Sequence, residues 1–272
     1  MSPVSRIIVF TDLDGTLLSE DTYAPGPALP VLKRCRDLGV PVIFCSSKTA
    51  AEILALRERL RNTDPFICEN GGAVYLPTGS FPELHLPVKR AGDYEIVEIG
   101  LPVTRLREVL REASRKAGAS VKGMGEMSLD EVRALTGLDE KGATLARQRA
   151  YDEPFILLSG DPDSLKREIS AAELTMTRGG RFFHILGDSD KGKAVRILAD
   201  LYRKERGPVT TVALGDAEND FPMFRAVDRA YLVQKPGGSW TNLSALPNLV
   251  KIEGIGPEGW AKAVAALLKT EH

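Results

Sequence analysis

The chain has 272 residues, which is enough for one large domain or two smaller ones. Hydrophobic residues make up 43% of it and charged residues 27%, and the formal net charge is −1. This composition is typical of a globular protein, and the charge balance excludes a surface that attracts nucleic acid or anionic lipid over its whole area.

From its pattern of apolar residues we expect neither export nor membrane insertion. Its first ten residues, MSPVSRIIVF, lack the apolar length of a signal peptide, and no run approaches the roughly 20 apolar residues of a membrane helix. The cysteines are Cys35, Cys45 and Cys68, an odd number without metal-type spacing, so we expect buried free thiols in a reducing compartment. We therefore expect a cytoplasmic protein without nucleic-acid or membrane partners, and the sequence indicates no oligomeric state.

The N-terminal part predicts strands alternating with helices. Residues 6–11, RIIVFT, are β-branched and nearly all apolar, which is typical of a strand buried on both faces of a parallel sheet. A helix is expected over 27–38, a buried strand over 40–45 and a helix over 47–61. Residues 65–77 indicate two strands that turn at Asn70-Gly71-Gly72.

The C-terminal part shows the same alternation. An amphipathic helix is expected over 191–205, and a closing helix over 258–269. Strands are expected at 209–214, 229–233 and 249–252. Strands that alternate with helices at both ends of the chain predict an α/β domain, a parallel sheet with helices on both faces.

The middle of the chain has a different pattern. From about residue 84 to residue 187 the expected order is strand, helix, strand, two helices, strand, helix and two strands, the last two turning at Gly179-Gly180. The stretch YEIVEIG alternates like a half-exposed antiparallel strand. We therefore expect an α/β core built from residues 1–83 and 188–272, with an α+β domain inserted over 84–187. Hinges are expected near 83–85 and 187–190.

Two acidic clusters follow two of the predicted core strands. Asp12 and Asp14 come directly after the first strand, and the stretch LGDAEND ends the strand at 209–214 with Asp216, Asn219 and Asp220. The carboxyl ends of parallel strands meet at one edge of a sheet, where ligands bind. Each cluster alone is compatible with solvated loop acids or helix caps. Together they are better explained by a shared cation, and Mg²⁺ suits carboxylate oxygens and a phosphate.

Two further positions suit a phosphate group. The strand at 40–45 ends in Ser46-Ser47-Lys48-Thr49, where hydroxyls and backbone N–H groups precede a helix. Helix capping explains the same residues equally well. Lys191 opens a helix, a position slightly unfavourable for a cation, which favours an anion nearby, although a lone lysine is usually solvated.

Together these residues resemble the haloacid dehalogenase (HAD) superfamily of phosphotransferases. The matches are DLDGT at 12–16, Ser46 at a strand end, Lys191 at a helix start and GDAEND at 215–220. The segment 84–187 looks like the C2-type cap of this superfamily. The resemblance implies a Rossmann-like parallel-sheet core with a cap, and phosphoryl transfer rather than dehalogenation, because dehalogenases lack the second acid of the pair.

The resemblance also implies roles for individual residues. Asp12 would be the nucleophile, and Asp14 the general acid and then the general base. Mg²⁺ would bind Asp12, the backbone carbonyl of Asp14, and Asp216, with Asn219 and Asp220 supporting this shell. The phosphoryl oxygens would be held by Ser46 and Lys191.

Longer stretches are similar to the mannosyl-3-phosphoglycerate phosphatase group, near the sucrose-phosphatase and Cof-like groups. These stretches are SSKTAAEI, ICENGGAVYLP, GEMSLDEVRALTGL, ARQRAYDEPF and GGRFFHILGDSDKGKAV. The implied reaction is hydrolysis of 2-O-mannosyl-3-phosphoglycerate to mannosylglycerate, a compatible solute, so the expected partner is a phosphorylated glycosyl-glycerate substrate.

Such a substrate requires a cationic clamp for its carboxylate and donors for its sugar hydroxyls. The candidates are Glu126, Gln148, Arg149, Arg181 and His184 in the cap, and Ser47, Lys48 and Thr49 beside the phosphate position. In RFFHIL, strand alternation places Arg181 and His184 on opposite faces, so His184 is also compatible with a half-buried sheet residue.

Several alternatives remain. The substrate could be sucrose phosphate or glucosyl-3-phosphoglycerate, and a phosphomannomutase would share the fold and the nucleophile. A non-catalytic receiver or sugar-phosphate sensor would also keep an acidic cluster on a parallel sheet, but receivers have no cap of this size, and intact acid, serine and lysine motifs favour an enzyme.

Overall fold

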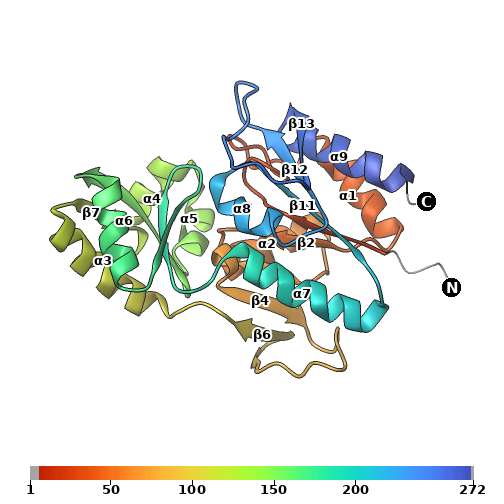
Figure 1. The fold of residues 1–272 in the computed structure, drawn as a ribbon, viewed down its shortest axis with the longest axis horizontal. Coiled ribbons are helices and arrows are strands. Elements are labelled where there is room, and N and C mark those ends of the chain that lie inside the picture. Colours follow the sequence, from red (N-terminus) through yellow and green to blue (C-terminus); the bar gives the residue numbers. More distant parts are fainter. Residues whose placement is uncertain (1–5, 271–272) are drawn as a thin grey trace.

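The computed structural model describes residues 6–270, which form two sheets of different size (Figure 1). The large sheet has the strand order β13-β12-β11-β1-β2-β3-β4-β6-β5. Its parallel strands are β1 (Ile7–Thr11), β2 (Val42–Cys45), β3 (Phe66–Cys68), β11 (Thr210–Gly215), β12 (Arg229–Gln234) and β13 (Leu249–Ile255). Its antiparallel edge is formed by β4 (Ala73–Pro77), β5 (Lys89–Ala91) and β6 (Tyr94–Glu98). The predicted α/β class is confirmed.

Helices cover both faces of the large sheet. One face packs against α1 (Ala28–Asp37), α2 (Ala50–Leu60) and α9 (Pro257–Thr270), and the other against α7 (Lys191–Arg206) and α8 (Phe221–Phe224). Strand β1 shows why the sequence is apolar throughout: Ile7 and Val9 join the first cluster, whereas Ile8 and Phe10 join the second. Successive residues of a strand face opposite sides, so both sets must be apolar.

The inserted segment forms the second sheet, whose strands all pair antiparallel in the order β7-β8-β10-β9. These strands are β7 (Ser120–Gly123), β8 (Asp152–Ser159), β9 (Thr175–Arg178) and β10 (Phe183–Leu186). One face packs against α3 (Val103–Ala117) and α6 (Pro162–Ala171), and the other against α4 (Leu129–Thr136) and α5 (Glu140–Ala146). From α3 onward the order of helices and strands matches the prediction, including the hairpin at Gly179-Gly180, but before α3 the structure has two strands, β5 and β6, where one was predicted.

Short 3₁₀ helices complete the path of the chain: η1 (Glu69–Gly71), η2 (Met124–Glu126) and η3 (Glu218–Asp220). The first of them joins β3 to β4, which pair antiparallel as the sequence predicts. The third follows β11 and carries the downstream acidic cluster. Thus two of these helices lie at the same end of the large sheet as the expected site.

The start of the inserted domain was misplaced by the sequence analysis. The stretch YEIVEIG forms β6, which pairs with β4 in the large sheet, and β5 pairs with β6. Tyr94 packs edge-on against Phe66 and Tyr75 of that sheet. The alternating pattern correctly predicts an antiparallel strand, but it carries no information about which sheet supplies the partner.

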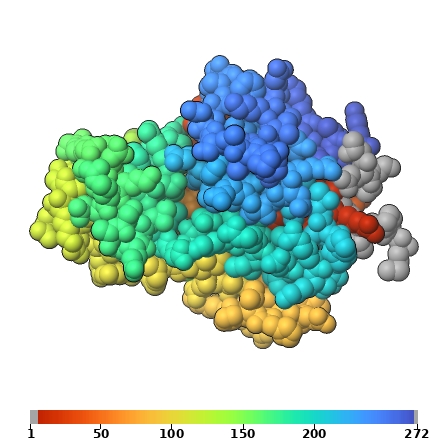
Figure 2. Space-filling model, in the orientation of Figure 1, coloured from red at the N-terminus to blue at the C-terminus, as the bar shows by residue number. Residues whose placement is uncertain are grey.

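The chain passes between the two sheets at residues 99–102 and again at 187–190. These crossings pack together, because a Cβ on Gly187 would lie 2.9 Å from the side chain of Leu101. The hinge expected near 83–85, between Pro82 and Pro87, is misplaced. These residues join β4 to β5, and both strands belong to the large sheet. Figure 2 shows the inserted segment, coloured yellow to green, as a lobe beside the larger one.

Within residues 6–270, none of the helices combines the length and the apolar character that a membrane crossing requires. The cysteine prediction is confirmed: Cys35, Cys45 and Cys68 are buried and free. Burial raises the pKa of each thiol above its usual value.

Candidate active site

The first acidic cluster lies in a tight turn after β1. Asp12 is 6% exposed, and Gly15 follows with a φ of +78°, in the left-handed region. A Cβ at Gly15 would lie 3.0 Å from the carboxylate of Asp216, so the turn requires a glycine both for its backbone and for this close approach. The hydroxyl of Thr16 donates to Oδ1 of Asp216 at 3.0 Å, which joins the two clusters.

Lys191 lies between carboxylates of the two clusters. Its fully buried ammonium donates to Oδ1 of Asp12 at 2.6 Å and to Oδ1 of Asp220 at 2.7 Å. Burial alone would lower the pKa of Lys191, but the two carboxylates raise it above its usual value, so the ammonium stays charged. These partners explain a lysine in the first turn of α7.

Asp220 holds the second cluster together. Its Oδ2 accepts from the backbone N–H of Asp216 at 3.0 Å and of Ala217 at 3.1 Å, while its Oδ1 is bound by Lys191. Both oxygens therefore have protein partners. This arrangement fits the supporting role implied for Asp220 better than a role as a direct metal ligand.

The buried acids outnumber the cation that touches them. Asp12, Asp216 and Asp220 each offer an oxygen within 4.8 Å of the others, and among the residues described the Lys191 ammonium is the only cation that bonds to this group. Burial raises the pKa of Asp12 to about 7, with Asp220 adding to it and Lys191 opposing it. Burial and the charge of Asp12 raise the pKa of Asp216 well above its usual value.

A divalent cation fits this cluster. Three carboxylates and one ammonium leave an excess of negative charge in a buried place. Buried negative charge is unfavourable, and this is why the pKa values of Asp12 and Asp216 are raised. Carboxylate oxygens are the ligands that Mg²⁺ prefers. The Asn219 side chain lies beside the cluster and its Oδ1 is buried without a hydrogen-bond partner in the described structure.

The carboxylate of Asp14 is not part of this cluster. Its Oδ2 forms an ion pair with the ammonium of Lys48 at 2.8 Å, and its Oδ1 is buried without a hydrogen-bond partner among the described residues. Lys48 also lies 3.6 Å from Glu52 and over the ring of Tyr23. Asp14 and Glu52 raise the pKa of Lys48 against the effect of burial, so Lys48 stays cationic.

Some of the predicted residues in the loop after β2 line the cavity, and others make contacts that stabilise the fold. Ser46 is buried at the strand end, and its hydroxyl accepts from the N–H of Lys48 at 3.3 Å. Ser47 and Lys48 line the cavity. Thr49 does not line it: its hydroxyl caps α2 by accepting from Glu52 N–H at 3.1 Å and donates to Leu145 O at 3.0 Å. The capping alternative therefore holds for Thr49, and none of its contacts in this structure supports the predicted substrate contact.

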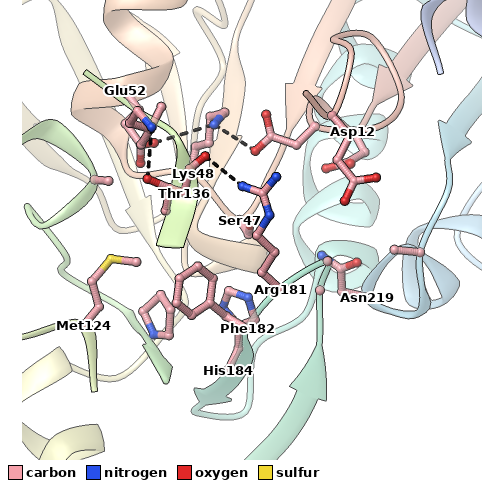
Figure 3. Close-up of a pocket in the computed structure, with 18 of the residues that line it drawn as sticks. Asp12, Ser47, Lys48, Glu52, Met124, Thr136, Arg181, Phe182, His184 and Asn219 are labelled. Carbon is pink, nitrogen blue, oxygen red and sulfur yellow. Dashed lines mark hydrogen bonds and ion pairs between the residues drawn. The ribbon is translucent and has the colours of Figure 1, made fainter. Parts of the chain in front are cut away.

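The cavity between the two lobes has a volume of about 200 Å³ and is lined by residues of both lobes. From the inserted domain Arg149, Arg181 and His184 reach it. Arg181 donates to the carbonyl of Thr136 at 2.7 Å, and Figure 3 shows it pointing into the space between Lys48 and Asn219. The cavity therefore places cationic groups of the inserted domain opposite the acidic cluster of the core.

His184 and Arg149 are both buried by partners. His184 Nδ1 lies 2.8 Å from Asp152 Oδ2, so the alternative of a satisfied sheet histidine is also true. Arg149 donates to the carbonyl of Ser47 at 2.6 Å and lies 3.6 Å from Asp152. Both groups still have an edge on the cavity, which makes them part of its wall.

Two other cap candidates lie outside the cavity. Glu126 lines a separate cavity on the inserted domain and lies 3.5 Å from Arg111. Gln148 is exposed and is not among the cavity residues. Their spacing in the sequence could not show this, because the side of the inserted domain that faces the core depends on the packing of the two lobes.

Sequence reasoning missed other residues of the cavity wall. They include Glu20, Tyr23, Glu52, Met124, Phe182 and Lys235. Lys235 directly follows β12, so its place at the carboxyl edge of a parallel strand was a usable signal. Glu20 and Tyr23 lie in a loop without periodic pattern, which offered none.

The comparisons with known proteins agree with this fold. A family model for the haloacid dehalogenase-like hydrolases matches residues 9–83. The chain is 44% identical, over 96% of its length and 97% of the relative, to the glucosyl-3-phosphoglycerate/mannosyl-3-phosphoglycerate phosphatase of Methanococcoides burtonii. It is 38% identical to the mannosyl-3-phosphoglycerate phosphatase of Pyrococcus furiosus, over 83% of the chain and 90% of the relative.

Solved structures show the same architecture at lower identity. A Bacteroides thetaiotaomicron phosphatase of the HAD superfamily superposes with a TM-score of 0.65 at 19% identity, covering 97% of this chain and 94% of that one. A HAD subclass IIB sugar phosphatase gives 0.57 at 17% identity, with coverage of 83% and 86%.

The fold and the site together define a HAD-type hydrolase, and the chain belongs to this superfamily. Within it the chain is a phosphatase of the family that includes the glucosyl- and mannosyl-3-phosphoglycerate phosphatases.

Proposed function

We propose that this enzyme hydrolyses 2-O-mannosyl-3-phosphoglycerate to mannosylglycerate and phosphate, with Mg²⁺ and through an aspartyl-phosphate on Asp12. The observation that carries the reaction class is the buried contact of Asp12 with Lys191 beside Asp216 and Asp220. The substrate is supported by the names of the relatives and by the cations that line the cavity.

In the first step an oxygen of Asp12 attacks phosphorus. Lys191 binds Oδ1, which leaves Oδ2 to form the new O–P bond while the bond from phosphorus to the glycerate oxygen breaks. The glycerate oxygen takes a proton from Asp14 as it leaves. The carboxylate of Asp14 lies outside the acidic cluster, so the two acids can approach the phosphoryl group from different sides.

In the second step water replaces Asp12 on phosphorus. Asp14, now ionised, removes a proton from the water, whose oxygen forms a bond to phosphorus as the bond to Asp12 breaks. Phosphate leaves, and Asp12 returns to its carboxylate form beside Lys191. Lys191 and the hydroxyl of Ser46 offset charge on the phosphoryl oxygens.

Mg²⁺ would be held by Asp12, Asp216 and the backbone carbonyl of Asp14, with Asp220 and Asn219 supporting these ligands. When bound, it neutralises charge on the transferring phosphoryl group.

The inserted domain and the loop after β2 would bind the rest of the substrate. Lys48 and Arg181 are the cations that suit its carboxylate, and a guanidinium can bind a carboxylate through two parallel hydrogen bonds. Ser47, Arg149 and His184 are the wall groups that suit sugar hydroxyls. The three cysteines are free thiols, which is typical of proteins in a reducing compartment. We therefore propose that the reaction takes place in the cytoplasm and that its product serves there as a compatible solute.

The test measures phosphate release from a panel of phosphorylated sugars and glycosyl-phosphoglycerates, with Mg²⁺ and with a chelator. We expect the highest kcat/KM for mannosyl-3-phosphoglycerate and no turnover without a divalent cation. A higher kcat/KM for glucosyl-3-phosphoglycerate or sucrose phosphate would overturn the substrate assignment. Phosphate transferred from labelled phosphoenzyme to a second position on a sugar, in place of free phosphate, would indicate a mutase.

A further inference from the structure

The turn that joins β3 to β4 has an unusual backbone. Glu69, Asn70 and Gly71 have φ values of +48°, +54° and +91°, three consecutive residues in the left-handed region. That conformation is unfavourable for a residue with a Cβ, so a glutamate there needs compensating contacts. A Cβ on Gly71 would overlap the carbonyl oxygen of Asp190. The turn therefore packs directly against residues 187–190, where the chain passes from the inserted domain back to the core.

The Glu69 side chain binds backbone of the inserted domain. It is 1% exposed, and its carboxylate accepts from three consecutive N–H groups, those of Ala150 at 3.0 Å, Tyr151 at 2.8 Å and Asp152 at 2.9 Å. A buried N–H without a partner is costly, so one carboxylate satisfies three donors at the start of β8. No metal ligand or proposed catalytic group takes part in these bonds.

The same turn is bonded to the core loop that carries Ser46 and Lys48. The N–H of Glu69 donates to the carbonyl of Lys48 at 2.9 Å, and the N–H of Asn70 donates to the carbonyl of Ser46 at 3.0 Å. The backbone of the turn is therefore bonded to the loop after β2, which carries Ser46 and Lys48. The side chain of Glu69, in the same turn, is bonded to the inserted domain.

Asn70 makes a second link between the lobes. Its Nδ2 donates to Asp152 at 2.9 Å, and its Oδ1 accepts from Asn219 at 3.0 Å. Asp152 in turn holds His184. A chain of buried polar groups thus runs from the acidic loop of the core to the cavity wall of the inserted domain.

The segment bound by Glu69 lies between cavity residues. Arg149 and Pro154, on either side of the three amides, both line the cavity. Tyr151 packs against Gly72 so closely that a Cβ there would overlap it, so the segment cannot move further toward the turn. The place of Arg149 and His184 at the cavity therefore depends on residues 150–152 staying where Glu69 holds them.

We propose that Glu69 is a positioning residue for the substrate-binding wall: its carboxylate fixes residues 150–152, and thereby Arg149 and His184, opposite Asp12. This proposal rests on the proposed function in one respect: the substrate used to test it is the one proposed above. A substrate that reaches the inserted domain needs this wall, whereas p-nitrophenyl phosphate needs little beyond the core groups. Loss of Glu69 should therefore affect the two kinds of substrate unequally.

The test compares Glu69→Gln with Glu98→Gln at pH 8, at a temperature where both variants are folded. Glutamine offers one acceptor oxygen and turns a donor toward the three N–H groups, so it breaks the arrangement at nearly unchanged size. Glu98 is the matched control, because it accepts from the hydroxyl of the same Tyr151 and from no backbone group of residues 150–152.

We expect Glu69→Gln to raise KM for mannosyl-3-phosphoglycerate, or for the best substrate of the panel, at least about tenfold. The kcat/KM for p-nitrophenyl phosphate should stay within about threefold, and Glu98→Gln should change neither by more than about twofold. Equal losses on both substrates, or no loss on either, would overturn the proposal.

Hydrogen exchange separates this inference from the proposed function. The amides of residues 150–152 should exchange at least about tenfold faster in Glu69→Gln and at the wild-type rate in Glu98→Gln, whatever the substrate. Wild-type exchange in both variants would refute the positioning role even if the phosphatase activity is correct. If Glu69→Gln does not fold, Glu69→Asp carries the same comparison, because aspartate tolerates the left-handed backbone and is too short to reach all three amides.

Discussion

The two walls of the cavity are built in different ways. On the core side, the side chains of Asp12, Lys191 and Asp220 are 9%, 0% and 0% exposed and bond to one another. On the inserted side, Arg181 is exposed and donates to two backbone carbonyls of α4, those of Leu135 and Thr136. The core groups hold each other in place, whereas Arg181 can be replaced without leaving a buried charge.

From this difference we expect the core groups to carry the reaction and the groups of the inserted domain to determine which substrates bind. Buried groups that share hydrogen bonds have one arrangement, which suits chemistry that is the same for every phosphate ester. An exposed side chain of the inserted domain, such as Arg181, can change without disturbing that arrangement. If the separation is real, core variants should lose activity on all substrates, and variants of the inserted wall only on large ones.

The largest effect is expected from Asp12→Asn. The amide cannot form the aspartyl-phosphate, so kcat should fall by about 10⁴-fold or more on mannosyl-3-phosphoglycerate and on p-nitrophenyl phosphate alike. Phosphate release at saturating substrate measures it, with circular dichroism to show that the variant is folded. A wild-type rate on either substrate would exclude Asp12 as the nucleophile.

Asp14→Asn should have a smaller effect that depends on the leaving group. The glycerate oxygen needs a proton to leave and nitrophenolate does not, so kcat/KM should fall by about 10² to 10⁴-fold for the sugar substrate and distinctly less for p-nitrophenyl phosphate. Equal losses in kcat/KM on the two substrates would remove Asp14 from the role of general acid.

Glu69 lies at the boundary of the two regions and should make stability depend on pH. Burial raises the pKa of its carboxyl from 4.5 to about 7, with Asp152 adding and Arg149 opposing. Between these values the folded chain keeps a proton that the unfolded chain has released, so the free energy of unfolding falls as pH rises.

Relative to Glu69→Gln, the wild-type free energy of unfolding should therefore fall by about 1.4 kcal/mol per pH unit through this window, on the order of 3 kcal/mol in total. Urea unfolding of both proteins at several pH values, in chelator, measures the difference. A constant difference from pH 4.5 to pH 7.5 would contradict the raised pKa.

Arg181→Ala tests the inserted wall directly. Loss of a charged hydrogen bond to the substrate carboxylate should raise KM for mannosyl-3-phosphoglycerate about 10- to 100-fold and leave kcat/KM for p-nitrophenyl phosphate within about threefold. Arg178→Ala is the matched control, because Arg178 lies on the neighbouring strand over Phe183 and outside the cavity. Similar KM values in the two variants would exclude the carboxylate clamp.

The smallest effect on catalysis is expected from Thr49→Ala. The variant loses the cap of α2 and the bond to Leu145, so the free energy of unfolding should fall by about 1 kcal/mol. Because Thr49 does not line the cavity, KM should stay within about twofold of wild type. A tenfold increase in KM with unchanged stability would restore Thr49 to the substrate site.

The core part of the site could be predicted from the sequence because it follows a geometric rule. Asp12 and Asp216 each follow a parallel strand, and parallel strands end at one edge, so their convergence needed no knowledge of the packing. Lys191 was found through its poor fit to a helix start, which the structure explains by Asp12 and Asp220.

The inserted wall could not be predicted in the same way. Glu126 and Gln148 have side chains as suitable for a sugar as those of Arg149, yet only Arg149 lines the cavity. Which face of the inserted sheet meets the core depends on contacts far apart in the sequence, such as those of Glu69 with residues 150–152.

By itself, then, the sequence determined the α/β class, most of the order of the elements and the convergence of the two acidic clusters, because periodicity and strand ends are local properties. Only the tertiary structure decided that β6 joins the large sheet, that Thr49 caps a helix and that Glu69 binds the inserted domain. Those outcomes depend on which partner a strand edge or a polar side chain finds, and the partner is supplied by the folded chain as a whole.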